Sequence, residues 1–145
     1  MARFSRRAEC TWEGPLKEGA GTVAAGTGAF SFPVTFPSRV EEPKGTTSPE
    51  ELIAAAHAAC YAMALAATMG RKNASARRVK VTAEVSAEFA NGIKIQASHL
   101  SVTAEGLQGL DGAAFPDLAR EAEGSCPVSN ALRGALKIDV DAKVL

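Results

Sequence analysis

The sequence has little of what builds a site for charged macromolecules. Its 145 residues contain 16 Lys and Arg against 16 Asp and Glu, so the formal net charge is zero. A chain without excess positive charge gives no electrostatic argument for binding nucleic acid or an anionic membrane surface. The glycines at 19, 21, 26 and 28 lack the spacing of a dinucleotide or Walker loop. They predict turns instead.

The N-terminus lacks the apolar segment of a signal peptide. Its basic start, MARFSRR, is followed by AECTWEGPLKEG, in which no apolar run occurs. We therefore expect no export and a cytoplasmic protein. In that reducing compartment the 3 cysteines are expected to serve reactivity or packing rather than a disulfide framework.

What is present is enough apolar sequence for one domain over residues 1–145, since 46% of the chain is hydrophobic. In the N-terminal third, Ala8, Cys10 and Trp12 alternate with polar residues. The apolar alternation over residues 30–36 is interrupted by Pro33, which indicates an edge strand. We expect a meander there, with Cys10 packed in a core.

The second half predicts more strands. Residues 79–89 alternate strictly between apolar and polar, and residues 136–144 alternate again. Between them, the apolar positions of 93–104 change phase, which predicts a β-bulge near Ser98–His99. The expected fold class is α+β, with mostly antiparallel strands against one buried central helix.

That helix is predicted over residues 48–70, SPEELIAAAHAACYAMALAATMG. Ser48 is an N-cap candidate, Glu51 completes a capping box, and Gly70 is a natural stop. The helix is apolar almost all round, so we expect burial on most of its faces. Its run of apolar residues has about the minimum length of a membrane span, but the amphipathic strands on both sides favour a core helix.

Two cysteines have different predicted surroundings. Cys126 precedes Pro127 at the start of a short predicted helix, where the helix dipole favours a thiolate and makes the sulfur a good leaving group. Cys60 lies in the middle of the long helix, where burial should raise its pKa and leave it inert unless a cation reaches it. Cys60 is therefore either a small core residue or a reactive thiol with a cationic partner.

Candidate cations stand just before the helix. Arg39 and Lys44 lie in FPSRVEEPKG, and a guanidinium can bind a thiolate and a carboxylate together. Glu50 is the candidate carboxylate, since the capping box occupies Glu51. Glu50 and Cys60 are ten residues apart, about 15 Å along a helix. One arginine serves both more easily if two such helices pack antiparallel, which predicts a homodimer with composite sites.

His57, one turn before Cys60, has several interpretations. It could activate Cys60 as a Cys–His pair, or contribute with Cys126 to a zinc site, or be a packed polar residue. The further ligands that zinc requires are not evident in the sequence, so we expect no metal.

The residues carry a resemblance at this point. The segments TSPEELIAAAHAACYAMALA (47–66) and CPVSNALRG (126–134), with WEG near the start and KGTTSPEEL before the helix, resemble the OsmC/Ohr family of thiol peroxidases. The similarity covers nearly the whole chain. The segment AAAHAACYAMAL and an arginine just before the helix resemble the OsmC branch of the family. The Ohr branch has its arginine in the first hairpin, where this chain has Lys17.

The resemblance implies an OsmC-like fold in an intertwined homodimer and an antioxidant enzyme that reduces organic hydroperoxides. By position, Cys60 matches the peroxidatic cysteine and Cys126 the resolving one. Arg39 matches the arginine that stabilises the thiolate, and Glu50 the carboxylate that orients it. The family needs no metal or flavin cofactor. The expected reductant is a dithiol, of which lipoyl groups on partner proteins are the reported type. Cys10 is outside the family pattern.

Two other classes of function stay open from the residues alone. One is a redox-sensing or binding module that forms the same disulfide without efficient turnover, and the other is a structural dimer whose cysteines merely pack. Turnover with a dithiol separates the first from an enzyme. Met63, Phe36 and Phe89 are candidate apolar walls that favour organic substrates. The sequence names neither the preferred hydroperoxide nor the protomer that supplies Arg39 and Glu50.

Overall fold

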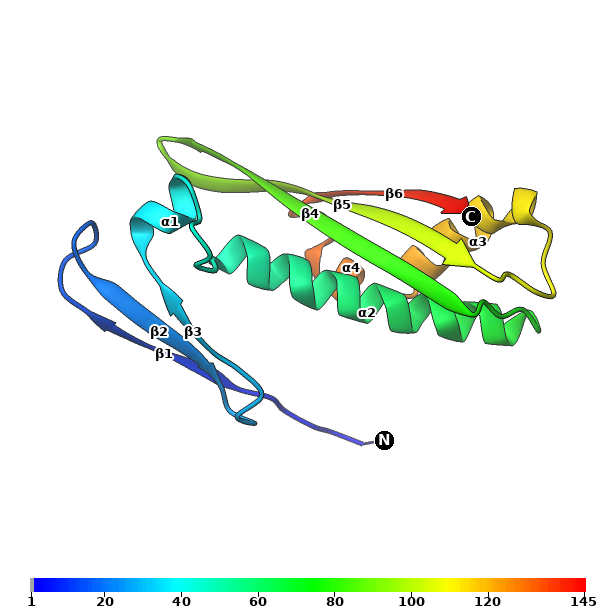
Figure 1. The fold of residues 1–145 in the computed structure, drawn as a ribbon, viewed down its shortest axis with the longest axis horizontal. Coiled ribbons are helices and arrows are strands. Elements are labelled where there is room, and N and C mark those ends of the chain that lie inside the picture. Colours follow the sequence, from blue (N-terminus) through cyan, green and yellow to red (C-terminus); the bar gives the residue numbers. More distant parts are fainter. Residues whose placement is uncertain (1) are drawn as a thin grey trace. The chain divides into compact units, whose positions relative to one another are not determined.

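The structure is a computed structural model that describes residues 2–145. The chain divides into two compact units, an N-terminal unit (Met1–Leu52) and a C-terminal unit (Ile53–Leu145). Figure 1 shows the order of elements, which is β1 (Ala8–Glu13), β2 (Ala20–Ala25), β3 (Ser31–Val34), α1 (Phe36–Val40), α2 (Pro49–Arg71), β4 (Arg78–Ala90), β5 (Gly92–Glu105), a 3-10 turn (Gly112–Ala114), α3 (Phe115–Gly124), α4 (Pro127–Leu132) and β6 (Lys137–Val144).

The N-terminal unit holds an antiparallel sheet in the order β1–β2–β3. Pro33 lies in β3, an edge strand, as its missing N–H requires. The other edge strand, β1, is exposed along all six residues. Cys10 therefore lies on the surface, and the expectation that it packs in a core is wrong for this chain. An edge strand has a neighbour on one side only, and in β1 alternation does not produce burial.

The C-terminal unit holds a sheet in the order β4–β5–β6. The central strand β5 pairs antiparallel with β4 and parallel with β6. The parallel pair needs a crossover, which the segment containing α3 and α4 provides. The fold-class prediction of α+β with mostly antiparallel strands is confirmed, and the β5–β6 pair is its parallel exception.

The predicted β-bulge exists, a little earlier in the chain than expected. Ser86 pairs with Ala97 and Ala87 pairs with Ile95, so Gln96 is the extra residue of β5. Beyond the bulge the inward phase changes, and Ser98 and Leu100 are fully buried. The bulge thus turns a serine hydroxyl into the interior of the unit.

The ends of α2 follow the predicted signals in part. The backbone N–H of Glu51 donates to Ser48 Oγ at 3.2 Å, which confirms the cap. The Glu51 carboxylate instead accepts from Thr47 Oγ1 at 2.7 Å. Gly70 does not stop the helix, which continues to Arg71. Asn73 ends it in the left-handed region with φ 55°, since asparagine tolerates that conformation well.

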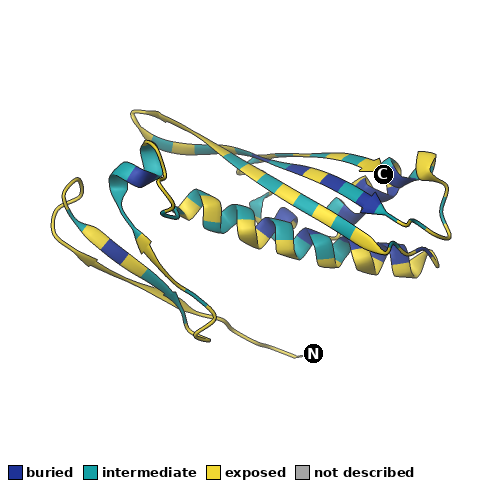
Figure 2. Ribbon diagram, in the orientation of Figure 1, coloured by how far each residue is buried: buried dark blue, intermediate teal, exposed yellow. Residues whose placement is uncertain are grey.

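One face of α2 is buried, and the expectation of burial on most faces is wrong for the single chain. The buried residues recur at the spacing of one helical face: His57, Tyr61, Leu65, Thr68 and Met69. They join a core formed with β5 and α3, which Figure 2 shows as dark blue segments. Strands on one side and α3 cover a single stripe of a helix that is apolar all round.

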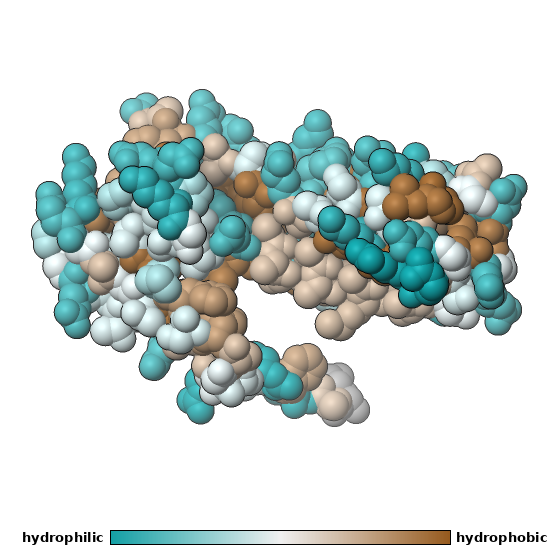
Figure 3. Space-filling view, viewed as in Figure 1, coloured by the Kyte–Doolittle hydropathy of each residue, from teal (hydrophilic) through white to brown (hydrophobic). Residues whose placement is uncertain are grey.

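The remainder of α2 is apolar surface. Met63 is 71% exposed, and exposed alanines surround it, which Figure 3 shows as a pale-brown area. By length and mean hydropathy (1.6) α2 could cross a membrane, and 28% of that stretch is buried within the chain. The core helix of a soluble protein passes the same test.

Candidate active site

The structure brings Cys60 and Cys126 together within the C-terminal unit. Cys60 lies on α2 and is partly buried, whereas Cys126 is fully buried at the N-cap of α4. Both are free thiols, and their side chains are within hydrogen-bonding contact. Two cysteines from elements far apart in the sequence thus form a local thiol pair.

The surroundings of Cys60 determine its protonation. Burial raises the pKa of the Cys60 thiol, the backbone N–H of Val128 lowers it, and the neighbouring Cys126 thiol raises it further. The net effect is a pKa above the ordinary value, as burial in mid-helix predicts. The resting group is therefore a thiol, and a further positive charge is needed to populate the thiolate at neutral pH.

The backbone N–H groups at the start of α4 interact with a different thiol from the one that the sequence predicted. We expected the orphan amides there to favour a thiolate at Cys126. The Cys126 side chain makes no capping hydrogen bond, and the amide of Val128, in the first turn, is directed at Cys60 instead. Sequence reasoning missed this contact because Cys60 and Val128 meet only through the packing of α2 against α4.

Arg39 and Glu50 form the second pair, within the N-terminal unit. Arg39, in the last turn of α1, donates from Nη2 to Glu50 Oε1 at 2.7 Å and from Nε to both carboxylate oxygens at 3.1 Å. Burial alone raises the pKa of the Glu50 carboxyl, but the Arg39 hydrogen bond, the Glu50 backbone N–H and the Arg39 charge outweigh it. The net pKa is below the ordinary value, so Glu50 is a carboxylate paired with Arg39.

The pairing of Arg39 with Glu50, rather than with Glu51, is as the sequence suggests. Lys44, the other candidate cation, is exposed in the following loop. The two pairs lie in different compact units. The contact of Arg39 with the Cys60 thiolate stays a prediction.

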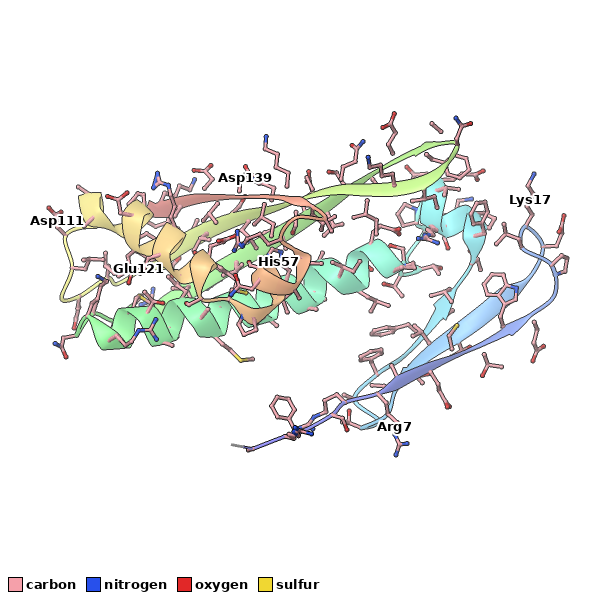
Figure 4. All side chains as sticks on the ribbon, turned by 180° about the vertical axis from the view of Figure 1, so that it is seen from behind. Arg7, Lys17, His57, Asp111, Glu121 and Asp139 are labelled. Atoms are coloured by element: carbon pink, nitrogen blue, oxygen red, sulfur yellow. The ribbon has the colours of Figure 1, made fainter. Side chains whose placement is uncertain are left out.

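His57 is a fully buried residue with two hydrogen-bond partners. Its Nδ1 lies 2.6 Å from Ser98 Oγ and its Nε2 lies 2.7 Å from Ser129 Oγ. Figure 4 shows its position on α2 beside α4. Because both ring nitrogens are occupied by hydroxyls, neither is left for a thiol or a metal ion. The packed polar interpretation of His57 is the one that the geometry supports.

Burial also controls the charge of this imidazole. It lowers the pKa of His57 below the ordinary value, and the carboxylate of Glu123 opposes that shift. His57 is therefore neutral at pH 7, with one ring nitrogen donating and the other accepting. Among residues 2–145, no cluster of three or more His, Cys, Asp or Glu side chains has a metal-binding arrangement.

Sequence reasoning missed several polar residues around the thiol pair. Ser98 and Ser129 are fully buried on β5 and α4. Glu123 accepts from Arg133 Nη2 at 2.9 Å, and this guanidinium also donates to Asn130 Oδ1 at 3.1 Å. The signal that could have found the serines is His57 itself, because a histidine on the buried face of an apolar helix needs two polar partners.

Two of the three residues suggested as apolar walls of a substrate site are largely exposed in the single chain. Met63 is 71% exposed and Phe89 is 59% exposed, so neither encloses a pocket by itself. Phe36 begins α1 in the N-terminal unit. Their role as walls for an organic substrate stays a prediction.

Comparison with known proteins gives consistent matches. Residues 42–141 match the family model described as OsmC-like protein. The chain is 35% identical over 141 residues to Peroxiredoxin OsmC of Escherichia coli (strain K12), covering 95% of this chain and 96% of that protein. It is 26% identical over 131 residues to organic hydroperoxide resistance protein OhrB of Bacillus subtilis (strain 168), covering 86% and 90%.

Solved structures agree on the fold. A crystal structure of an organic hydroperoxide resistance protein OsmC from Legionella pneumophila has a TM-score of 0.78 and 27% identity, covering 99% of this chain and 100% of that one. The crystal structure of OhrB of Bacillus subtilis has a TM-score of 0.71 and 26% identity, covering 94% and 98%. The OsmC-like fold expected from the resemblance is confirmed.

Proposed function

Because this chain belongs to the OsmC/Ohr family, we propose that it is a thiol-dependent peroxidase that reduces organic hydroperoxides to alcohols. The observation that supports this most strongly is the Cys60–Cys126 pair, two free thiols in hydrogen-bonding contact. The backbone N–H of Val128 is aimed at the Cys60 sulfur, where it stabilises negative charge.

In the first step, the Cys60 thiolate attacks the terminal oxygen of the hydroperoxide. The O–O bond breaks, and the leaving alkoxide takes a proton and departs as the alcohol. The Cys60 sulfur loses a pair of electrons and becomes a sulfenic acid. Partial burial of Cys60 leaves the sulfur reachable, whereas Cys126 is fully buried, which supports the peroxidatic role that we propose for Cys60.

In the second step, Cys126 resolves the sulfenic acid. Its sulfur attacks the Cys60 sulfur, the S–O bond breaks, and the hydroxide leaves with a proton as water. The product is a Cys60–Cys126 disulfide. The two side chains are already in contact, so the bond forms without moving either element far. An external dithiol then restores both thiols by exchange, and lipoyl groups on a partner protein are our candidate.

Arg39 supplies the charge that Cys60 lacks. Burial raises the pKa of Cys60, and a guanidinium beside the sulfur lowers the free energy of the thiolate. We propose that Arg39, oriented by Glu50, does this in a homodimer whose sites combine two protomers. The exposed apolar surface of α2 around Met63 is the surface that a second copy would cover. A cytoplasmic location is part of this proposal.

The experiment is peptide mapping by mass spectrometry without reductant. Fully reduced protein is treated with a small excess of cumene hydroperoxide, beside a Cys60→Ser variant. We expect a rapid Cys60–Cys126 crosslink in the parent chain and none in the variant. If both thiols stay free, or if exposed Cys10 is the one oxidised, the mechanism is wrong.

Turnover decides between the enzyme and the alternative, a redox-sensing or binding module of the same fold. With excess dithiol, an enzyme consumes many equivalents of hydroperoxide for each chain. A sensor forms the same disulfide and then consumes peroxide no faster than the dithiol alone. Cys126→Ser is the matched control, because it keeps Cys60 and removes only the resolving thiol.

A further inference from the structure

His57 connects three elements of the C-terminal unit through one fully buried ring. It lies on α2, its Nδ1 is 2.6 Å from Ser98 Oγ on β5, and its Nε2 is 2.7 Å from Ser129 Oγ on α4. All three residues are 0% exposed. Burying these polar groups is costly unless each is paired. The ring therefore holds α4 and β5 in fixed places relative to α2.

The arrangement repeats in the thiol pair. His57 precedes Cys60 by three residues, and Ser129 follows Cys126 by three residues. Going along α2 from residue 57 to 60, the contacts on α4 go from 129 back to 126. The His57–Ser129 bond and the Cys60–Cys126 contact are therefore adjacent contacts between α2 and the α4 segment, which run in opposite directions.

Because these two contacts are adjacent, both depend on how α4 is placed along α2. A disulfide forms only when the two Cα atoms lie within about 4.4–6.8 Å of each other, and each residue of helix advances the chain by about 1.5 Å. A slip of α4 along α2 that breaks the His57–Ser129 bond also separates Cys126 from Cys60. Ser98 fixes the other ring nitrogen, and the bulge at Gln96 is what turns Ser98 inward.

We propose that His57 is a positioning residue for the resolving step, holding Ser129 and its helix so that Cys126 captures the Cys60 sulfenic acid. This rests on the proposed peroxidase function. His57 touches neither sulfur in this role and acts through α4. When the His57–Ser129 hydrogen bond is broken, the Cys60 sulfenic acid persists longer. A second hydroperoxide then transfers an oxygen to the same sulfur, giving a sulfinic acid and a second alcohol.

The test compares Ser129→Ala with Ser98→Ala. Each variant removes one buried hydroxyl that is hydrogen-bonded to His57, so each leaves one ring nitrogen of His57 unpaired and the two variants are matched. Only Ser129 lies on α4, the helix whose N-cap is Cys126. Reduced protein is mixed with cumene hydroperoxide in the presence of dimedone, which traps sulfenic acid. Mass spectrometry then gives the ratio of trapped Cys60 to Cys60–Cys126 disulfide, and thermal unfolding is measured for each variant.

We expect Ser129→Ala to raise this ratio by roughly three- to tenfold, the effect of one hydrogen bond. Ser98→Ala should stay within about twofold of the parent chain, because the Ser129 bond is kept. A ratio unchanged in Ser129→Ala, or raised equally in both variants, overturns the positioning role. The ratio is set after the peroxide has reacted, so it does not depend on the rate of attack. A parent chain in which Cys60 is never oxidised would refute the proposed function itself.

A second pair of variants uses the ring. A glutamine amide nitrogen can take the place of Nε2, whereas an asparagine amide nitrogen reaches only the place of Nδ1. We expect His57→Gln to restore the Ser129 bond and a ratio near that of the parent chain, and His57→Asn to behave like Ser129→Ala. Equal ratios in the two variants would contradict the proposal even if both lost stability.

Discussion

The two compact units divide the proposed chemistry between them in an unequal way. The C-terminal unit holds the thiol pair against a core in which Tyr61, Leu65 and Cys126 are fully buried, while Cys60 is partly buried. The N-terminal unit holds the cation, Arg39, on a short helix after a sheet whose first strand is exposed throughout. The C-terminal unit has a nucleophile, Cys60, whose pKa burial raises, and the N-terminal unit has the charge that we propose lowers it.

The difference shows how stability and reactivity can be assigned to separate parts of one small chain. The core of the C-terminal unit fixes the two sulfurs but disfavours the thiolate. The Arg39–Glu50 pair stays partly exposed, with side chains 31% and 13% exposed. A pair of this kind contributes little to folding. Changes in the core of the C-terminal unit should therefore affect folding most, and changes at the Arg39–Glu50 pair of the N-terminal unit should affect activity most.

The largest expected effect is on stability, at Leu65. Leu65→Ala removes a fully buried side chain from the C-terminal core and should cost about 2–5 kcal/mol. Phe32→Ala, in the N-terminal sheet where Phe32 is 39% exposed, should cost about 1 kcal/mol or less. Urea unfolding of both variants checks this. Similar losses would mean that the N-terminal sheet is as well covered as the core.

The next effect is on activity, at Arg39. Arg39→Gln removes the proposed electrostatic partner of the thiolate and should lower peroxide reduction about a hundredfold. Unfolding should change by about 1 kcal/mol or less, because the ion pair is partly exposed. Lys44→Gln is the matched control, since Lys44 is exposed in the neighbouring loop. Equal activity in Arg39→Gln and the parent chain would remove Arg39 from the mechanism.

The units should also differ in how pH affects their stability. Burial lowers the pKa of His57 below its ordinary 6.5, so below 6.5 the unfolded chain binds the proton that the folded chain does not. Stability should therefore fall as the pH decreases from 6.5 toward the lowered folded value. The pKa of Glu50 is also lowered, from 4.5, so its contribution is lost only at pH values below 4.5.

Unfolding curves between pH 7 and pH 4 test this order. We expect His57→Gln to flatten the loss that begins near pH 6.5 and Glu50→Gln to leave it unchanged. The linkage of one site is at most about 1.4 kcal/mol per pH unit. A parent chain with constant stability over this range would mean that His57 titrates alike in both states.

The sequence predicted the long helix, the edge position of Pro33, the phase change in β5 and both residue pairs. These features depend on local signals: alternation, a cap, a missing N–H and the family motifs. It did not predict that β1 is exposed or that α2 is buried on one face only. Alternation says which residues share a face, but not whether another element covers that face.

The site was predicted in its cysteines but not in its polar partners. Val128 reaches Cys60 through a backbone amide, which any residue except proline would supply, so no side chain signals it. Ser98 and Ser129 are ordinary serines until the bulge and α4 bring them to His57. Contacts that depend on packing between distant segments leave no local pattern.

The smallest expected effect lies at the start of α2, where the boundary between the units falls between Leu52 and Ile53. Ser48→Ala removes the hydroxyl that accepts the Glu51 N–H at 3.2 Å and should cost about 1 kcal/mol. Thr47→Ala is the matched control, because its hydroxyl bonds only the exposed Glu51 carboxylate, and should cost a few tenths of a kcal/mol. We expect Ser48→Ala also to lower peroxide reduction, because Glu50 lies in the first turn of α2, which this change loosens. A Ser48→Ala variant with reduced stability and unchanged activity would separate the orientation of Arg39 from the cap of the helix.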